Sequence, residues 1–278
     1  MTVLRPATPA EALRLYASRP KAAPLAGGTD FMVAWNMALH NGREVLDLSR
    51  LKEWARIERK GGFVAIGALC THTRIRENVL IAKEFPLLAE ACSTVGAWAI
   101  QNRGTLGGNI ANASPAGDTF PALAVYDAVI RTAGPRGTRR IPILEVFAGV
   151  KKTTLGPSEL IEAVELPFSK RRPDRALFRK VGTRAAQAIS KTVAAGQLWL
   201  GRGGLVEDVR LGLGSMAVTV RRLSAVEAAL KGRKLDPTGV ERALALLGKD
   251  VSPIDDIRST AEYRMTVSRN IIRSFLLP

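Results

Sequence analysis

Two glycine pairs, each beside a threonine and near acidic or amide side chains, are the residues of this chain best suited to binding a ligand. Residues 24–31 read PLAGGTDF, and residues 103–118 read RGTLGGNIANASPAGD. Glycine allows positive φ angles and lets the backbone approach a ligand closely, while hydroxyl, amide and carboxylate groups supply specific hydrogen bonds. One such loop is weak evidence, but two in one chain indicate an extended ligand that is held from two sides.

A dinucleotide such as FAD has the chemistry that these loops would serve. Its pyrophosphate needs backbone amide donors, and the first glycine pair lies at a predicted strand-to-helix turn, where amides attract anions. Its ribityl hydroxyls need partners such as Thr105, Asn109, Ser114 and Asp118. The alternative is that both loops are only tight structural turns, an explanation that suits one loop better than two together.

Side chains that could carry out catalysis are scarce. His40 and His72 are the only histidines, and the sequence has no GxSxG, HExxH, GxGxxG or P-loop pattern. Cys70 and Cys92 belong to no cluster, so this chain cannot hold an iron–sulfur centre alone, and we expect free, buried thiols. The sequence therefore predicts no catalytic side chain and no metal site, and any redox chemistry requires a bound cofactor.

The composition is that of a globular protein with a strongly basic surface. The chain has 278 residues, 46% of them apolar, and a net charge of +16. Its most basic segment, 169–184, contains one aromatic residue and no nucleic-acid-binding signature, which favours a solvated surface or a docking face for an acidic partner. The N-terminus lacks a signal sequence and no apolar run is long enough to span a membrane, so we expect a soluble cytoplasmic protein.

The sequence pattern predicts mixed helices and strands with a main boundary near residue 170. Thr8 and Pro9 start a helix over 7–18. We expect further elements as follows: strands at 22–27, 44–51 and 63–70, helices at 30–39 and within 73–95 with a new start at Pro86, a long loop at 102–118 with little secondary structure, strands at 124–134 and 159–168, antiparallel strands from 175 to 216, and helices at 224–232, 237–248 and about 260–276.

The segments PLAGGTD and NRGTLGGNIANASPAGDTFPAL resemble the FAD-binding medium subunit of the molybdenum hydroxylases, the family of xanthine, carbon monoxide and nicotinate dehydrogenases. The resemblance continues through ELIEAVELP and the C-terminal DDIRSTAEYRMTVSRNIIRSFL. It implies an α+β fold of the vanillyl-alcohol-oxidase or MurB type, in which two subdomains hold an extended FAD. The expected FAD-binding domain is 1–170, with subdomains of about 1–55 and 56–170, and the C-terminal domain, 171–278, contains a small antiparallel sheet with helices.

The resemblance also implies which residues bind FAD. The segment expected to wrap the pyrophosphate comprises Leu25, Ala26, Gly27, Gly28, Thr29, Asp30 and Phe31. Those expected to serve the pyrophosphate, the ribityl chain and nearby groups are Thr105, Gly107, Gly108, Asn109, Ala113, Ser114, Gly117 and Asp118. The residues expected at the flavin ring are Val95, Ile161 and Lys180, with Lys180 as a cation beside the ring.

The function implied is electron transfer. A large molybdenum–pterin subunit would hydroxylate the substrate, a small subunit with two 2Fe-2S clusters would carry electrons, and FAD on this chain would pass them to NAD, a quinone, a cytochrome or oxygen. A dimer of heterotrimers is the implied assembly. The stretch GTRAAQAIS at 182–190, shortly after Lys180, lacks the acidic residues of some relatives, so the acceptor stays open. Two alternatives also stay open: a self-sufficient flavin oxidase or dehydrogenase, and a basic nucleic-acid-binding or scaffold protein.

Overall fold

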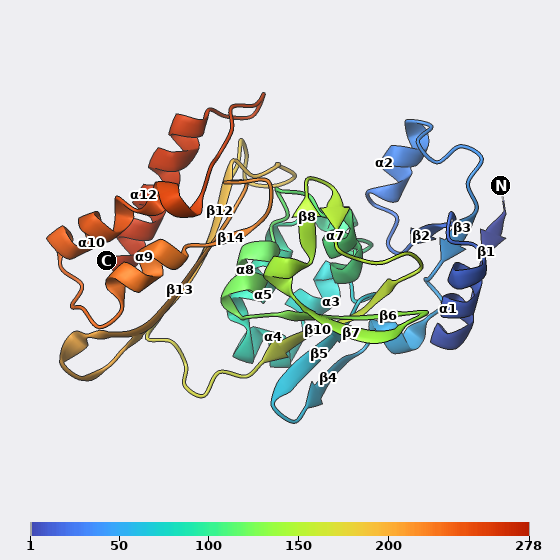
Figure 1. Cartoon of the computed structure of the whole chain (residues 1–278), viewed down its shortest axis with the longest axis horizontal. Coiled ribbons are helices and arrows are strands. Elements are labelled where there is room, and N and C mark those ends of the chain that lie inside the picture. Colours follow the sequence, from blue (N-terminus) through green and yellow to red (C-terminus); the bar gives the residue numbers. More distant parts are fainter. Residues whose placement is uncertain (1, 278) are drawn as a thin grey trace.

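Three main sheets, each covered by helices, follow one another along the chain in the computed structural model, which describes residues 2–277 (Figure 1). The first is parallel, with the order β1-β3-β2, and its strands are Val3–Leu4 (β1), Ala23–Leu25 (β2) and Val45–Asp47 (β3). Helix α1, Pro9–Ser18, begins as predicted, because the Thr8 hydroxyl accepts a hydrogen bond from the Glu11 amide. The first glycine pair lies between β2 and helix α2, Phe31–Asn36.

The second sheet is antiparallel and forms the centre of the molecule. Its order is β4-β5-β10-β6-β7, and the strands are Ile57–Lys60 (β4), Phe63–Gly67 (β5), Val129–Gly134 (β6), Gly137–Pro142 (β7) and Leu160–Pro167 (β10). The helices packed with it are His72–Arg76 (α3), Val79–Glu84 (α4), Pro86–Thr94 (α5), Trp98–Gln101 (α6), Leu106–Asn112 (α7) and Phe120–Val125 (α8). Short elements complete this part: Lys52–Ala55 (η1), Ile143–Glu145 (η2), Phe147–Gly149 (β8) and Lys152–Thr153 (β9).

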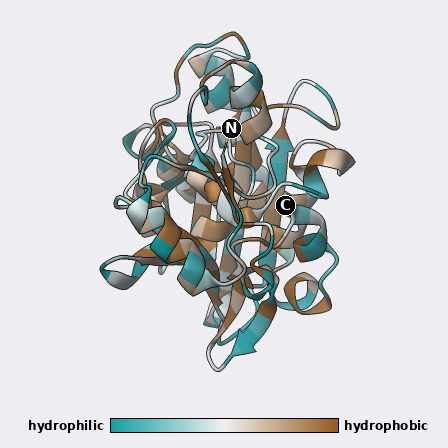
Figure 2. Ribbon diagram, turned by 90° about the vertical axis from the view of Figure 1, so that its right-hand side faces the viewer, coloured by the Kyte–Doolittle hydropathy of each residue, from teal (hydrophilic) through white to brown (hydrophobic). Residues whose placement is uncertain are grey.

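The third sheet is antiparallel and contains the C-terminal strands, as predicted. Its order is β11-β12-β13-β14, formed by Arg175–Val181 (β11), Thr192–Leu200 (β12), Val206–Gly214 (β13) and Arg221–Arg222 (β14), with a 3-10 turn at Arg202–Gly204 (η3). The helices on its outer face are Ser224–Leu230 (α9), Pro237–Leu244 (α10), Leu247–Asp250 (α11) and Ala261–Leu276 (α12). Their apolar residues form one core with the sheet, and Figure 2 shows hydrophobic residues gathered inside and hydrophilic ones outside.

The inner face of the third sheet packs against the central part of the chain. Alternate residues of a strand point to opposite faces, so Val193 and Ala195 join the central core while Ala194 and Leu198 join the C-terminal core. Gly212 allows β13 to lie on helix α8, because a Cβ at this position would lie 2.9 Å from the Pro121 carbonyl oxygen. The two cores therefore meet across one sheet.

Several predicted elements were wrong. The predicted loop at 102–118 contains helix α7, which forms because Thr105 caps it and because it packs on β10, although two glycines lower its helix propensity. The predicted strand at 124–134 begins only at Val129, since Phe120–Val125 is a buried helix. Strand β4 occupies part of the stretch between the strands predicted at 44–51 and 63–70.

Candidate cofactor-binding site

The two glycine loops lie directly against each other. A Cβ on Gly27 would lie 1.9 Å from the carbonyl oxygen of Arg103, so only glycine permits this approach of the first loop to the second. The side-chain amide of Asn112 donates a hydrogen bond of 2.8 Å to the Asp30 carboxylate, which joins the same two segments a second time. The two segments, far apart in sequence, thus lie side by side.

The first loop presents a row of free backbone donors. Within residues 2–277, the amides of five consecutive residues have no acceptor: Ala26, Gly27, Gly28, Thr29 and Asp30. The turn is possible because Gly28 has a φ of +82°. Backbone amides rarely lack partners unless they face solvent or a ligand, and an open turn of amides next to a helix start attracts anions. This row has the chemistry that a pyrophosphate requires.

The second glycine pair has a different role, because protein acceptors already occupy the first amides of α7. The Leu106 amide donates to the Cys70 carbonyl, the Gly107 amide to the Ala68 carbonyl at 2.9 Å, and the Gly108 amide to the Thr105 hydroxyl. A Cβ on Gly107 would lie 2.5 Å from the Cβ of Ala68. Gly107 and Gly108 therefore bring α7 close to its neighbours and leave the surface beside it open.

Polar side chains of the second loop are fixed by one another. The Asn109 side-chain oxygen accepts a hydrogen bond of 2.7 Å from the Thr119 hydroxyl, which leaves the Asn109 amide nitrogen available to a ligand. Ala113 ends α7 in the left-handed conformation, with a φ of +47°, and its carbonyl accepts from the Lys151 amide. Strain of this kind in a non-glycine residue is typical of functional sites.

A buried ion pair connects the second loop to the C-terminal sheet. The Lys180 ammonium lies 2.6 Å from a carboxylate oxygen of Asp118 and donates to the Thr94 carbonyl at 2.8 Å. The other oxygen of Asp118 is buried and has no hydrogen-bond partner among the described residues. Burial raises the pKa of the Asp118 carboxyl to about 6, and the Lys180 ammonium opposes that rise. This orphaned oxygen is positioned to accept a hydrogen bond from a ligand.

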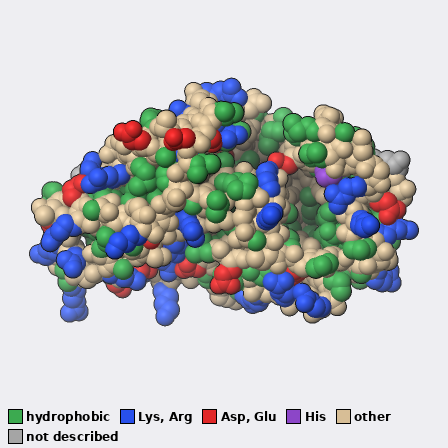
Figure 3. All heavy atoms as spheres, turned by 45° about the horizontal axis from the view of Figure 1, so that its top comes forward, with side chains coloured by type: hydrophobic (Ala, Val, Ile, Leu, Met, Phe, Trp, Pro, Cys, Tyr) green, Lys and Arg blue, Asp and Glu red, His purple; other side chains and the backbone are tan. Residues whose placement is uncertain are grey.

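Two hydrogen bonds join the loops around this ion pair. The Ser190 hydroxyl donates to the Ala116 carbonyl, and the Gln187 amide donates to the Gly96 carbonyl, next to half-buried Val95. Ser114 lies half-buried in the same loop, and buried Gly117 leaves room for the Phe120 ring. Figure 3 turns this side of the molecule towards the viewer and shows a hollow right of centre.

Ile161 is a residue of the hydrophobic core. It sits on β10, only 7% exposed, within the central hydrophobic core and beside a bulge in the pairing with β6. Helix α7 packs on this strand. Ile161 is therefore a buried residue of the strand on which α7 packs.

Sequence reasoning missed several residues that shape the site. Asn112 and Thr119 hold polar partners in place, and both lie within the quoted segment NRGTLGGNIANASPAGDTFPAL, which is the signal that was available. Arg264 on α12 is 3% exposed and donates to the Lys191 and Ser215 carbonyls, so it holds two loops near the ion pair. No local pattern around Arg264 indicates this role.

The histidines and cysteines fit structural roles. His72 is buried, and its amide donates to the Gly104 carbonyl; burial lowers the pKa of its imidazole to about 4. Both cysteines are free and buried. Among residues 2–277 no group of histidine, cysteine and acidic side chains could hold a metal ion. Across the same residues, no helix has the length and apolar composition to cross a membrane.

Family models match both parts of the chain. The "FAD binding domain in molybdopterin dehydrogenase" matches residues 1–169, and the "CO dehydrogenase flavoprotein C-terminal domain" matches residues 177–278. The chain belongs to this family of FAD-binding subunits, which confirms the resemblance. It carries an FAD-binding domain and is an oxidoreductase subunit, as predicted.

Relatives of the same kind match over most of their length. The glyceraldehyde dehydrogenase medium chain of Sulfolobus acidocaldarius is 29% identical, over 92% of this chain and 90% of the relative. The xanthine dehydrogenase FAD-binding subunit of Escherichia coli O157:H7 is also 29% identical, over 98% and 93%. A solved carbon monoxide dehydrogenase from Hydrogenophaga pseudoflava contains a chain with a TM-score of 0.93 and 26% identity, covering 99% of this chain and 96% of that one. This agreement confirms the predicted fold class.

Proposed function

We propose that this chain is the electron-transfer flavoprotein of a cytoplasmic molybdenum hydroxylase complex. In this proposal a large molybdenum–pterin subunit delivers electrons to two 2Fe-2S clusters on a small subunit. This chain takes the electrons from those clusters and passes them to an external acceptor. FAD supplies a redox centre that one-electron carriers can reduce and that can deliver two electrons onward. The complex is proposed to be a dimer of heterotrimers, with NAD, a quinone, a cytochrome or oxygen as the acceptor.

The observation that carries this proposal is the row of free amides at residues 26–30, packed against the second glycine loop. These amides would bind the pyrophosphate, flanked by Leu25 and Phe31. The residues proposed to line the rest of the FAD are Thr105, Gly107, Gly108, Asn109, Ala113, Ser114, Gly117 and Asp118, with Val95, Ile161 and Lys180 at or below the ring.

The ion pair supports a redox rather than an acid–base role for the chain. The Lys180 ammonium is held by Asp118 and the Thr94 carbonyl, so it supplies positive charge at a fixed place. The carboxylate of Asp118 balances that charge and keeps one oxygen free for the cofactor. His72 is buried and uncharged at neutral pH because burial lowers the pKa of its imidazole, so it is unsuited to general acid catalysis.

Assembly with partner subunits agrees with the charge of the chain. A net charge of +16 favours docking on acidic protein faces, because complementary charge speeds association and selects partners. The basic segment 169–184 supplies part of this charge. We also propose a division into domains at residue 170, within the connector 168–174, and limited proteolysis there tests it.

Titration of the purified chain with FAD tests the binding site. Gly27→Ala adds a Cβ that would lie 1.9 Å from the Arg103 carbonyl oxygen, so the first loop must move away and its amides lose their arrangement. We expect this variant to bind FAD roughly 100-fold more weakly, because several charge-assisted hydrogen bonds are lost together. Gly62→Ala is the matched control, since a Cβ there meets nothing within 4 Å. Equal FAD affinity of the two variants would contradict the proposed site.

A further inference from the structure

The buried face of helix α12 becomes polar towards its N-terminal end. The buried residues of this helix include Arg264, Ser268, Ile272 and Phe275. Ile272 and Phe275 belong to the core of the C-terminal part, as expected for the inner face of a helix, whereas Arg264 is a charged residue that is only 3% exposed. Figure 1 shows the first turns of α12 at the upper end of the third sheet. A buried guanidinium costs free energy unless it is well paired, so helix packing alone does not explain Arg264.

Arg264 bridges two strands where their pairing ends. The last paired residues of β12 and β13 at this end are Val193 and Gly214. Beyond them, the Nη1 atom of Arg264 donates to the Lys191 carbonyl at 2.8 Å and to the Ser215 carbonyl at 2.9 Å. Ser215 has a φ of +61°, and a non-glycine residue keeps such a conformation only where its surroundings hold it. Arg264 is part of what holds it.

Each of these two carbonyls belongs to a residue that contacts one side of the buried ion pair. The Lys191 amide donates to the Val181 carbonyl at 2.8 Å, directly after the lysine of the pair. The Ser215 amide donates to the Pro115 carbonyl at 3.0 Å, in the loop that carries the aspartate of the pair. Arg264 therefore fixes, through one residue on each side, the segments that carry the two charges.

A pair of buried hydroxyl groups supplies a second link. The side-chain oxygens of Ser190 and Ser215 lie 2.9 Å apart, and the two residues are 1% and 9% exposed. The Ser190 hydroxyl also donates to the Ala116 carbonyl at 3.4 Å. The backbone and the side chain of Ser215 thus both connect the region held by α12 with the second glycine loop.

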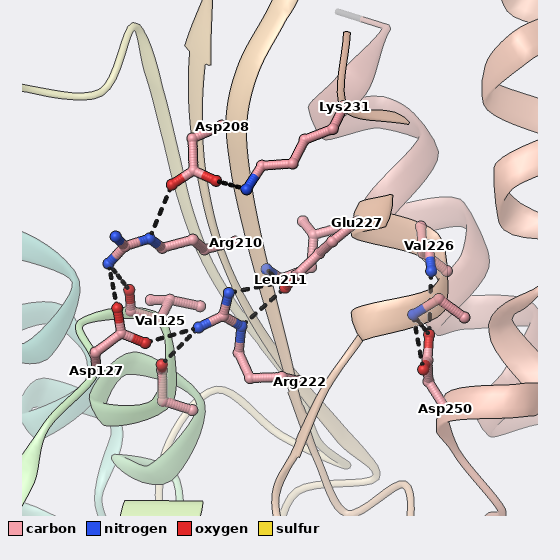
Figure 4. A network of polar contacts seen from close by, with 12 residues as sticks. Val125, Asp127, Asp208, Arg210, Leu211, Arg222, Val226, Glu227, Lys231 and Asp250 are labelled. Atoms are coloured by element: carbon pink, nitrogen blue, oxygen red, sulfur yellow. Dashed lines mark hydrogen bonds and ion pairs between the residues drawn. The ribbon is translucent and has the colours of Figure 1, made fainter. Parts of the chain in front are cut away.

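The C-terminal part has a separate set of contacts with the centre of the molecule. Asp118 precedes helix α8 and Asp127 follows it. Figure 4 shows that Asp127 pairs with Arg210 at 2.6 Å and with Arg222 at 3.0 Å. These ion pairs attach the third sheet to the end of α8 without Arg264. Loss of Arg264 therefore leaves this attachment in place and removes the contacts beside the buried ion pair.

We propose that Arg264 is a positioning residue for FAD, acting through the Lys191 and Ser215 carbonyls. It keeps Lys180 and Asp118 in the arrangement that accepts the cofactor, so the C-terminal helix controls how tightly FAD is held. This inference rests on the proposed FAD site.

Arg175 provides a matched control at the opposite end of the same helix. Its Nη1 atom also donates to two backbone carbonyls, those of Phe275 at 3.4 Å and Leu276 at 2.8 Å. Arg175 begins strand β11, whereas Lys180 lies near the end of that strand. Loss of either arginine loosens α12 on the third sheet, but only the loss of Arg264 affects the segments of the ion pair.

Equilibrium titration with FAD compares the native chain, Arg264→Met and Arg175→Met at a temperature at which circular dichroism shows all three to be folded. We expect Arg264→Met to bind FAD roughly tenfold more weakly and Arg175→Met to stay within about twofold of the native chain. The visible absorption of the bound flavin should shift in Arg264→Met alone, because the charges beside the cofactor move. Arg264→Lys keeps the charge and hydrogen-bond donors, so it should recover part of the affinity.

Ser190→Ala tests the same connection where Arg264→Met fails to fold. It removes only the hydroxyl link, and we expect it to weaken FAD binding about threefold. In the double variant with Arg264→Met the two effects should not add, since both act on the same loop. The proposal is overturned if Arg264→Met binds FAD as tightly as the native chain, if Arg175→Met weakens binding equally, or if Ser190→Ala leaves the affinity unchanged. A native chain that binds no FAD would refute the proposed function itself, and this inference with it.

Discussion

Replacing Lys180 by methionine tests the buried ion pair through the pH dependence of stability. Asp118 has a pKa of 3.8 when exposed and about 6 in the folded chain. A raised pKa means that the folded state binds the proton more tightly. Folding therefore loses stability as pH rises from about 4 to about 6, where the carboxyl ionises, and no more above that.

Without the Lys180 ammonium, Asp118 has no cation to oppose the effect of burial, and the pKa of its carboxyl rises further. For each pH unit above about 6, the unfolding free energy of the variant then falls by up to roughly 1.4 kcal/mol relative to that of the native chain. Between about pH 5.5 and pH 7.5, the loss of unfolding free energy caused by Lys180→Met should grow by about 2 kcal/mol.

Urea unfolding of the FAD-free chain at these two pH values measures this difference. The matched control is the double variant Lys180→Met, Asp118→Asn, in which no carboxyl titrates and the additional loss at high pH should disappear. A loss from Lys180→Met that is the same at both pH values would refute the account, since it would show that Asp118 and Lys180 are not electrostatically coupled.

Three further predictions follow from buried groups. Arg264→Met should lower the unfolding free energy by roughly 2–4 kcal/mol, because it leaves the Lys191 and Ser215 carbonyls without their donor, while Asp256 keeps its contacts with Arg258; urea unfolding measures this, and a loss below about 1 kcal/mol would contradict it. Burial raises the pKa of the Cys70 thiol to about 11, and it also raises the pKa of the Cys92 thiol. A thiol reagent at neutral pH should therefore react with these cysteines only after the chain unfolds, and reaction in the native chain would contradict this. Because burial lowers the pKa of the His72 imidazole, the unfolding free energy should fall by up to about 3 kcal/mol as the pH is lowered from about 6.5 to about 4. His72→Gln should abolish that part of the pH dependence, and an unchanged pH dependence in this variant would contradict the prediction.

Local signals predicted the elements whose ends are marked by particular residues. Thr8 with Pro9 started α1 and Pro86 started α5, and the helix predicted at about 260–276 spans Ala261–Leu276. Alternating apolar residues indicated the C-terminal antiparallel strands. These signals are short-range, so they can be recognised in the sequence without knowledge of the partner segments.

Long-range packing determined what the sequence did not reveal. Helix α7 contains Gly107 and Gly108, which are poor helix formers, and it depends on contacts with Ala68 and β10. The glycine loops were predicted to act together, but the Gly27–Arg103 contact and the occupied amides of α7 depend on how the two segments meet. Their different roles, free donors in one loop and close packing in the other, follow only from the three-dimensional structure.

Reduction of the flavin in a reconstituted complex tests the central claim most directly. The chain, loaded with FAD, is mixed with the molybdenum and iron–sulfur subunits and a reducing substrate, and the visible flavin absorbance is followed by stopped flow. The electron-transfer proposal predicts rapid loss of this absorbance with the complete complex and none when the iron–sulfur subunit is omitted. Flavin that stays oxidised in the complete complex, or that the substrate reduces in the isolated chain, would contradict it.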